Sequence, residues 1–251
     1  MYEKWKEMQT DWDDSDFLRD KANRLMKKRW KRLNMIIASF IEKEVIQRNE
    51  YISLLDAGAG RGDFYKFVEN FVKKYTGIEP SKSMHKDDII EDDFELITGM
   101  AEEIKYAEEY DVCLLKEMLD HCYDPEKVIG NAYRALKPGG SIIISLTNEK
   151  AYYKLVFKNR AKKIRESHHD HLYYFKPEEV EGLLLKSGFT DIRTMSLNYL
   201  RMPGFMEEAA GAFPEKIVFA ILGAADFIGR ALLRGMGGSF IIRAKKESGS
   251  A

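Results

Sequence analysis

The chain has 251 residues, with 40 basic and 41 acidic side chains, a formal net charge of −1 and 45% apolar residues. This balanced composition excludes an intrinsically disordered chain, because the apolar content is sufficient to form a core. The length suits one α/β unit, and we expect a single domain over residues 1–251.

Cysteine content and apolar runs bear on where the protein works. Two cysteines occur, Cys113 and Cys122, and their spacing fits neither a disulfide framework nor a zinc site. The N-terminus is polar and acidic, unlike a signal peptide. The longest apolar run, residues 217–225, is far shorter than the roughly 20 residues that span a bilayer. We therefore expect a cytoplasmic protein that does not cross a membrane.

The first 50 residues predict a helical leader. Acidic side chains dominate residues 3–20, and basic side chains dominate residues 19–32. Through the basic part, apolar residues recur every three or four positions from Ala22 to Phe40, which is the pattern of an amphipathic helix. The cations form either a solvated face or a surface that attracts an anionic substrate, a nucleic acid or a lipid headgroup.

From residue 51 onward, short apolar runs alternate with helical patterns. This repetition predicts an α/β fold, a parallel sheet with helices on both faces. The expected strands are residues 52–56, 75–79, 94–98, 110–115, 141–146, 189–197 and 239–244.

Three helices are predicted between or after these strands. Asp124-Pro125 begins one that ends before the glycines at 139–140, and a second covers residues 177–186 with Gly188 as its cap. The third is an apolar helix over residues 214–234, inside an insertion over 198–238. It is a candidate lid, dimer surface or interfacial membrane helix.

A glycine-rich loop follows the first predicted strand, which ends in Asp56. Three alternating glycines, at 58, 60 and 62, precede a helix expected to begin near Asp63. The third position of a GxGxxG pattern holds Asp63, whose carboxylate would repel a pyrophosphate, and GxxxxGK[ST] is absent. A nicotinamide dinucleotide and a nucleoside triphosphate are therefore disfavoured as ligands.

The loop suits a ligand that has an amino group, a carboxylate and a ribose but no phosphate. Asp56 can attract an ammonium group, and main-chain amides of the loop can receive a carboxylate. Glu79, at the end of the next strand, can accept hydrogen bonds from both ribose hydroxyls.

Several motifs together carry a resemblance to a known family. They are DAGAGRG (56–62), IEPSKSM (78–84), GMAEEIKY (99–106), YDVCLLKEMLDHCYDPEKVIGNAYRALKPGG (110–140) and HLYYFKPEEVEGLLLKSGF (171–189). The chain resembles class I S-adenosylmethionine-dependent methyltransferases, of the small-molecule group with the methyltransferase-11 type domain, over roughly residues 50–197. The resemblance implies a Rossmann-like, seven-stranded, mostly parallel sheet whose last strand is antiparallel. It also implies S-adenosylmethionine as the cofactor.

The resemblance assigns parts of the cofactor to residues of this chain. Asp56, Gly58 and Gly60 would contact the methionine portion, and Glu79 would bind the ribose. The family often has Asp where this chain has Met100, so adenine recognition would use the Ala101 amide, the Glu102 carboxylate and apolar packing. The main chain of Lys116 would also meet the cofactor. The cofactor-binding candidates are Asp56, Gly58, Ala59, Gly60, Glu79, Pro80, Met100, Ala101, Glu102 and Lys116.

Two histidines are candidate bases for a hydroxyl acceptor. His121 follows the fourth predicted strand, five residues beyond Lys116, and Asp120 beside it is able to orient it. His171 matches a His-bearing turn that borders the acceptor pocket in the family. The run of residues 167–171 also contains ligand types suited to zinc or iron, but ligands in one extended run point to alternating sides, and we predict no metal site.

Absent motifs narrow the acceptor. Enzymes of this superfamily that methylate nucleobase amino groups resemble one another in an [Asn/Asp/Ser]-Pro-Pro-aromatic run after the fourth strand, where this chain has Lys-Glu-Met-Leu at 116–119. The near-neutral charge also lacks the basic bias of many nucleic-acid binders. We therefore expect in-line methylation of a small-molecule or lipid-like acceptor at oxygen. RNA methylation and cofactor binding without catalysis are the alternatives.

The expected organisation has four parts within the one domain. Residues 1–50 form the helical leader or cap, 51–197 the cofactor-binding core, 198–238 the inserted lid, and 239–251 the last strand and tail. A homodimer and a peripheral membrane contact are candidate associations of such a molecule.

Overall fold

The computed structural model describes residues 1–11, 22–84, 88–156, 171–202 and 204–248. Its centre is an eight-stranded sheet in the order β3-β4-β2-β1-β5-β6-β8-β7. The strands are β1 (Ile52–Ala57), β2 (Val72–Glu79), β3 (Ile89–Ile90), β4 (Phe94–Thr98), β5 (Tyr110–Lys116), β6 (Leu136–Thr147), β7 (Phe189–Leu197) and β8 (Ser239–Lys246).

The pairing confirms the predicted architecture. β4, β2, β1, β5 and β6 are parallel neighbours, whereas the last strand, β8, runs antiparallel between β6 and β7. All seven predicted strands are present, and β3 is a two-residue addition, antiparallel to β4 at the sheet edge. β6 begins at Leu136, earlier than expected, because Leu136 already pairs with Tyr110 of β5.

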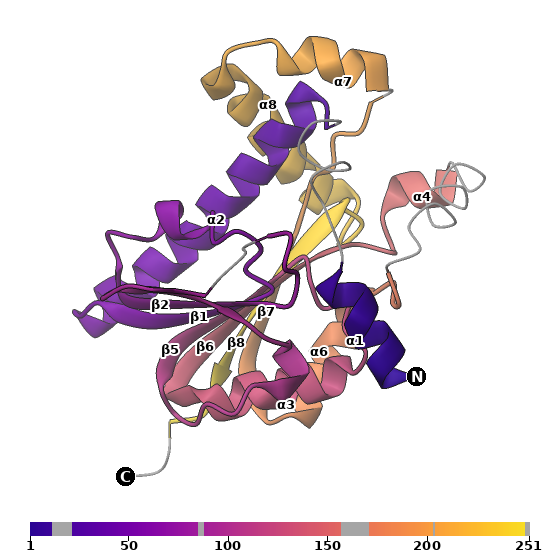
Figure 1. The fold of residues 1–251 in the computed structure, drawn as a ribbon. Helices are drawn as coiled ribbons and strands as arrows, with labels where there is room; N and C mark the ends of the chain where they lie inside the picture. The colour runs from indigo at the N-terminus through magenta and orange to yellow at the C-terminus, as the bar shows by residue number, and fades with distance from the viewer. Residues whose placement is uncertain (12–21, 85–87, 157–170, 203, 249–251) are drawn as a thin grey trace.

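Helices cover both faces of the sheet (Figure 1). They are α1 (Tyr2–Thr10), α2 (Arg24–Arg48), α3 (Pro125–Ala135), α4 (Tyr152–Val156), α6 (Pro177–Lys186), α7 (Gly204–Gly211) and α8 (Glu215–Leu232). Leu33, Ile37 and Ile41 of α2 share one apolar cluster with Leu54 of β1. Val128 of α3 and Val180 of α6 belong to another cluster, with strand residues that point the opposite way. The sheet therefore has a core on each face.

The segment after the glycine loop differs from the prediction. Instead of an α-helix from Asp63, turns and the short 3-10 helix η2 (Tyr65–Phe67) occupy it. Only nine residues separate Gly62 from Val72, where β2 begins. Phe64 and Val68 must both reach the core within that span, and each is fully or almost fully buried. A tight turn satisfies this packing better than two turns of helix.

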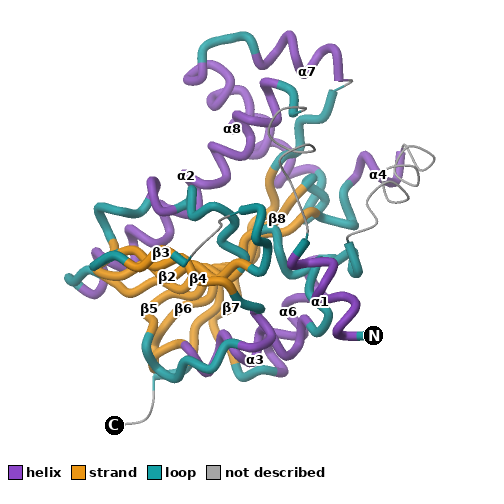
Figure 2. Tube along the Cα trace, viewed as in Figure 1, coloured by secondary structure: helices purple, strands orange, loops and turns teal. Residues whose placement is uncertain are grey.

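The leader and the insertion each contain two helices, where the sequence predicted one. α1 and α2 are separate helices, and the Asn23 side chain accepts a hydrogen bond from Met26 N at 2.8 Å to cap α2. The insertion holds α7 as well as the predicted helix α8. Both lie beside the amino-terminal part of α2, beyond the end of the sheet (Figure 2). Within the described part of the chain, no helix is both long enough and apolar enough to cross a membrane.

Candidate cofactor and acceptor site

The carboxyl ends of β1, β2 and β5 bring the main candidates to one edge of the sheet. β1 lies between β2 and β5, with Ala57 opposite Ile78 and Leu115. Asp56, one residue before the end of β1, therefore lies beside Glu79 and Lys116, the last residues of β2 and β5, at the edge where open α/β sheets bind their ligands.

Asp56 is fully buried yet keeps one carboxylate oxygen unsatisfied. Tyr75 donates its hydroxyl to Asp56 Oδ2 at 2.5 Å, whereas the buried Oδ1 has no hydrogen-bond partner among the residues that the structure describes. Burial raises the pKa of the Asp56 carboxyl from 3.8 to about 6, although the positive charge of Lys116 opposes this shift. Such an oxygen is suited to a cation that arrives with the ligand.

The glycine loop is held against β2 by main-chain hydrogen bonds. Gly58 N and Ala59 N both donate to Ile78 O, at 2.8 and 3.1 Å. Gly58 has φ +77°, and a Cβ there would lie 2.7 Å from Met118 Cβ. Gly60 has φ +58°, but a Cβ there would meet no atom within 4 Å. Glycine is thus required for tight packing at 58, and for backbone conformation beside open space at 60.

Glu79 connects this loop to the segment that follows β2. Its Oε2 accepts from Gly60 N at 2.9 Å, and its Oε1 accepts from Ser81 N at 3.0 Å. The residue is only 8% exposed. Pro80 lies between Glu79 and Ser81 in the sequence and directly follows β2. The carboxylate is therefore fixed in orientation at the same edge as the open position above Gly60.

The three predicted adenine residues are buried after β4, within or beside η3 (Ala101–Glu103). Met100 packs in the interior, and Ala101 O accepts from the Asn131 amide at 2.9 Å. Glu102 Oε1 accepts from Tyr123 N at 2.9 Å. That carboxylate oxygen therefore braces the turn after β5, a structural role that the sequence did not indicate.

Lys116 and two histidines complete the edge after β5. Lys116 Nζ lies 5.4 Å from the centre of the Phe64 ring. His171 Nδ1 is 3.2 Å from Asp120 Oδ2, and the rings of His121 and His171 are 4.4 Å apart, edge to face. The structure thus joins two histidines that lie 50 residues apart in the sequence. His85, His168 and His169 lie outside the described residues.

The main chain fixes the histidine pair. Leu172 N and Tyr173 N both donate to Asp120 O, at 2.9 and 3.1 Å. His121 Nε2 is 3.9 Å from Asp120 Oδ1, so Asp120 lies closer to His171 than to its sequence neighbour. The sequence indicated Asp120 as an orienting group, but for the other histidine. Long-range pairing of the 171–173 segment with the turn after β5 decides the partner.

Sequence comparison now identifies the family. The model of a methyltransferase domain family matches residues 15–194, well over half of the chain. The chain belongs to this methyltransferase family. A ubiquinone biosynthesis O-methyltransferase of Hydrogenovibrio crunogenus is 28% identical over 174 residues, which cover 62% of this chain and 71% of that protein. A ubiquinone biosynthesis O-methyltransferase of Coxiella burnetii is 26% identical over 203 residues, which cover 67% of this chain and 82% of that protein. The protein is an S-adenosylmethionine-dependent methyltransferase of class I fold.

Solved structures share this methyltransferase fold. The [4+2]-cyclase SpnF superposes with a TM-score of 0.58 at 19% identity, over 93% of this chain and 86% of that one. An S-adenosylmethionine-dependent methyltransferase of Thermotoga maritima, a possible histamine N-methyltransferase, superposes with a TM-score of 0.54 at 19% identity. The superposition covers 88% of this chain and 94% of that one. At these identities the likeness establishes the fold.

The residues at the strand ends fit S-adenosylmethionine. The unpartnered Asp56 Oδ1 suits the ammonium group of its methionine portion, and the open space at Gly60 leaves room for a ligand against the main chain. Glu79 offers carboxylate oxygens beside that space. When bound, S-adenosylmethionine would supply an activated methyl group, which passes in line to a nucleophile as S-adenosylhomocysteine leaves.

Helix α1 contacts the segments that follow β2 and β5, and the predicted helical leader or cap named none of these partners. Trp5 Nε1 donates to His121 O at 3.0 Å, and the Tyr2 and Tyr123 rings lie edge to face at 5.4 Å. Lys82 N donates to Thr10 O at 3.1 Å. The apolar spacing from Ala22 to Phe40 predicted one long helix, which corresponds to α2, and it carried no signal for α1 or for these partners.

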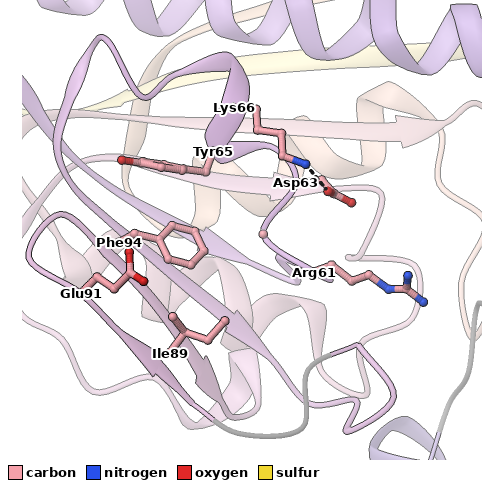
Figure 3. A pocket seen from close by; sticks show the side chains of 8 residues that line it. Arg61, Asp63, Tyr65, Lys66, Ile89, Glu91 and Phe94 are labelled. Carbon is pink, nitrogen blue, oxygen red and sulfur yellow. Dashed lines mark hydrogen bonds and ion pairs between the residues drawn. The ribbon is translucent and has the colours of Figure 1, made fainter.

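A hollow of about 270 Å³ lies between residues 61–66, which include the last glycine of the loop, and residues 89–94 of β3 and β4 (Figure 3). Arg61, Asp63, Lys66 and Phe94 are among its lining residues, and Lys66 pairs with Asp63 at 3.2 Å. None of the predicted cofactor or histidine residues lines it. The hollow is therefore separate from the candidate residues at the strand ends.

Proposed function

We propose that this methyltransferase methylates a hydroxyl oxygen of a small-molecule or lipid-like acceptor, with His171 as the base. The observation that carries the proposal is the 3.2 Å contact of His171 Nδ1 with Asp120 Oδ2, at the edge that also holds Asp56 and Glu79. The relatives named ubiquinone biosynthesis O-methyltransferases favour oxygen as the accepting atom.

The cofactor roles follow the geometry of the strand ends. Asp56 Oδ1 receives the ammonium group, Glu79 receives the ribose hydroxyls, and Gly58, Ala59 and Gly60 form the floor of the site. Met100 and Ala101 contribute packing and main chain around the adenine, together with the main chain of Lys116. Pro80 continues the ribose-binding strand end. We assign Glu102 to bracing the turn that carries His121, because its Oε1 accepts from Tyr123 N.

The residues of the acceptor side supply orientation and a proton acceptor. His171 Nδ1 lies 3.2 Å from Asp120 Oδ2, and a hydrogen bond from Nδ1–H to this oxygen would fix the tautomer whose Nε2 takes the proton of the acceptor hydroxyl. The imidazolium that results is stabilised by the Asp120 carboxylate. His121 packs edge to face on His171 and is the second candidate base. Removing the proton as the oxygen–methyl bond forms avoids a positively charged oxygen in the product.

Turnover with a defined phenolic probe tests this assignment. With S-adenosylmethionine and a panel of hydroxylated aromatics such as catechol, we expect formation of S-adenosylhomocysteine. His171→Gln should lower kcat about 100-fold or more near pH 7 while leaving cofactor affinity intact. The deficit should shrink as pH approaches the pKa of the phenol, about 10, because a phenolate needs no base.

His121→Gln is the matched control for this experiment. If it lowers kcat with the same pH signature while His171→Gln does not, the base is His121 and the assignment to His171 is wrong. Asp120→Asn tests orientation, because it should lower kcat and shift the pH profile without changing cofactor affinity. A homodimer, and a cytoplasmic location, remain predictions about this chain.

A further inference from the structure

Helix α8 has two opposite faces, and only one of them packs on the protein. Its buried face consists of Val218, Leu222, Asp226 and Gly229. On the opposite side, five helical residues, together with Phe213 two residues before the helix, are apolar and 48–76% exposed. We call these residues the apolar stripe: Phe213, Ile217, Ile221, Phe227, Ile228 and Leu232.

The stripe is continuous along the helix and carries no charge. At 3.6 residues per turn, its helical members fall within an arc of about 140°. The charged residues Glu215, Lys216, Asp226 and Arg230 lie outside that arc. Aliphatic and aromatic side chains this exposed and this well aligned are typical of a binding surface rather than of a solvated helix face.

A basic hollow of about 310 Å³ lies at the beginning of the stripe. It is lined by Arg24, Lys27, Lys28, Lys31, Gly211 and Glu215. Lys28 Nζ donates to Phe213 O, which places these cations next to the first stripe residue. Arg24 pairs with Glu208, and Lys31 pairs with Glu215. Four cations thus meet two carboxylates, and the hollow remains positive overall.

We propose that α8 lies in the surface of an anionic lipid bilayer, with the apolar stripe in the acyl region and lipid phosphates in the basic hollow. The placement of cations beside an exposed apolar helix face matches what an interfacial helix needs. It also explains why the apolar side points away from the protein, since the buried face of α8 already fixes the helix to α2. A second copy of the chain would bring a second set of the same cations to the contact, which disfavours it as the occupant.

Co-sedimentation with vesicles tests the proposal without any acceptor or turnover. Full-length protein should bind vesicles of equal parts phosphatidylglycerol and phosphatidylcholine, and should bind phosphatidylcholine vesicles much more weakly. Ile221→Gln with Phe227→Gln should lower the partition coefficient about tenfold or more. Lys27→Gln should lower it about fivefold, and added salt should weaken binding of the wild type.

Matched variants distinguish docking from general surface effects. Ile46→Gln with Leu185→Gln removes two residues that are 70% and 65% exposed on α2 and α6, and Lys73→Gln removes an exposed cation of β2. Both should bind vesicles like the wild type. A preserved thermal shift with S-adenosylhomocysteine shows that each variant is folded. This readout also separates a failure of lipid binding from a failure of the proposed function.

Three outcomes would overturn the proposal. They are no preference for anionic vesicles, unchanged binding by the stripe variant, and a wild-type dimer that the stripe variant dissociates while neither protein binds vesicles. The last outcome, read by analytical ultracentrifugation, would assign the stripe to self-association.

Discussion

Asp56 and Glu79 end neighbouring strands but have different electrostatic states. Both carboxylate oxygens of Glu79 accept main-chain hydrogen bonds, whereas within the described part of the chain Asp56 accepts from the Tyr75 hydroxyl on one oxygen and from no donor on the other. An ionised carboxylate without enough donors is costly to bury, so the pKa of Asp56 rises to about 6. A cationic group that reaches Oδ1 would supply the missing interaction.

This state of Asp56 predicts how cofactor affinity depends on pH. A ligand ammonium binds the ionised carboxylate, so affinity for S-adenosylmethionine should be constant above about pH 7. Below pH 6 it should fall by up to about tenfold per pH unit, because protonated Asp56 must first lose its proton. Isothermal calorimetry between pH 5 and 8 measures this. Asp56→Asn should bind weakly with a flat profile, whereas Glu79→Gln should bind weakly and keep the slope.

A wild-type affinity that is constant from pH 5 to 8 would mean that Asp56 does not bind the ammonium group.

The sequence could identify Asp56, because a buried strand that ends in a carboxylate before alternating glycines is a local pattern. It could not predict the Tyr75 contact, which depends on the register of two parallel strands, with Leu54 opposite Tyr75. The bracing role of Glu102 was missed for the same reason, since its partner lies 21 residues away.

At the scale of elements, two buried ion pairs fasten α2 to the insertion. Arg29 Nη1 is 2.7 Å from Glu207 Oε1 of α7, and Arg32 Nη1 is 2.6 Å from Asp226 Oδ2 of α8. Asp226 Oδ1 also accepts from Tyr199 N at 3.1 Å. The sequence pattern predicted that the basic positions of α2 form a solvated face or a face that attracts an anionic ligand. Some of them instead face acidic partners more than 170 residues away.

Removing one member of such a pair should be more destabilising than removing both. Arg32→Ala leaves Asp226 buried and without its cation, and should lower the free energy of unfolding by about 3–5 kcal/mol. Arg32→Met with Asp226→Asn should recover part of that loss, because no charge is stranded and Asn can still accept from Tyr199 N. Urea unfolding followed by circular dichroism measures both variants.

An exposed pair on the same helix provides the control. Lys31 and Glu215 are 2.8 Å apart, but their side chains are 49% and 40% exposed, so Lys31→Ala should change stability by less than about 1 kcal/mol. Equal losses for Lys31→Ala and Arg32→Ala would mean that burial does not set the strength of these contacts. The two helices of the insertion would then be held by apolar packing alone.

At the scale of the whole molecule, α1 connects three loops at the carboxyl edge of the sheet. Lys6 pairs with Glu103 after β4, Trp5 donates to His121 O after β5, and Thr10 O accepts from Lys82 N after β2. The alternation of strands and helices predicted a parallel sheet, but the strand order that brings these loops together is known only from the structure. Contacts between residues about 100 positions apart have no local signal, so the cap was predicted without its partners.

These contacts predict that α1 controls how fast the cofactor leaves. A short helix joined by a few contacts to the domain opens locally at a lower free energy than the sheet unfolds. Trp5→Phe removes the hydrogen bond to His121 O but keeps an aromatic ring, and should speed release of S-adenosylmethionine about fivefold. Trp5→Ala should speed release about tenfold or more, because the buried ring is lost as well. Surface plasmon resonance with immobilised protein measures the dissociation rate directly.

The unfolding of the ligand-free protein serves as the comparison for α1. If α1 is a local cap, Trp5→Ala should leave the midpoint of urea unfolding of the sheet nearly unchanged while the dissociation rate rises. A large fall in the midpoint with an unchanged dissociation rate would instead make α1 an integral part of the core. The first result would place the leader in the ligand exchange step, because its contacts reach the segments that follow β2, β4 and β5, the strand ends at which the ligand is proposed to bind.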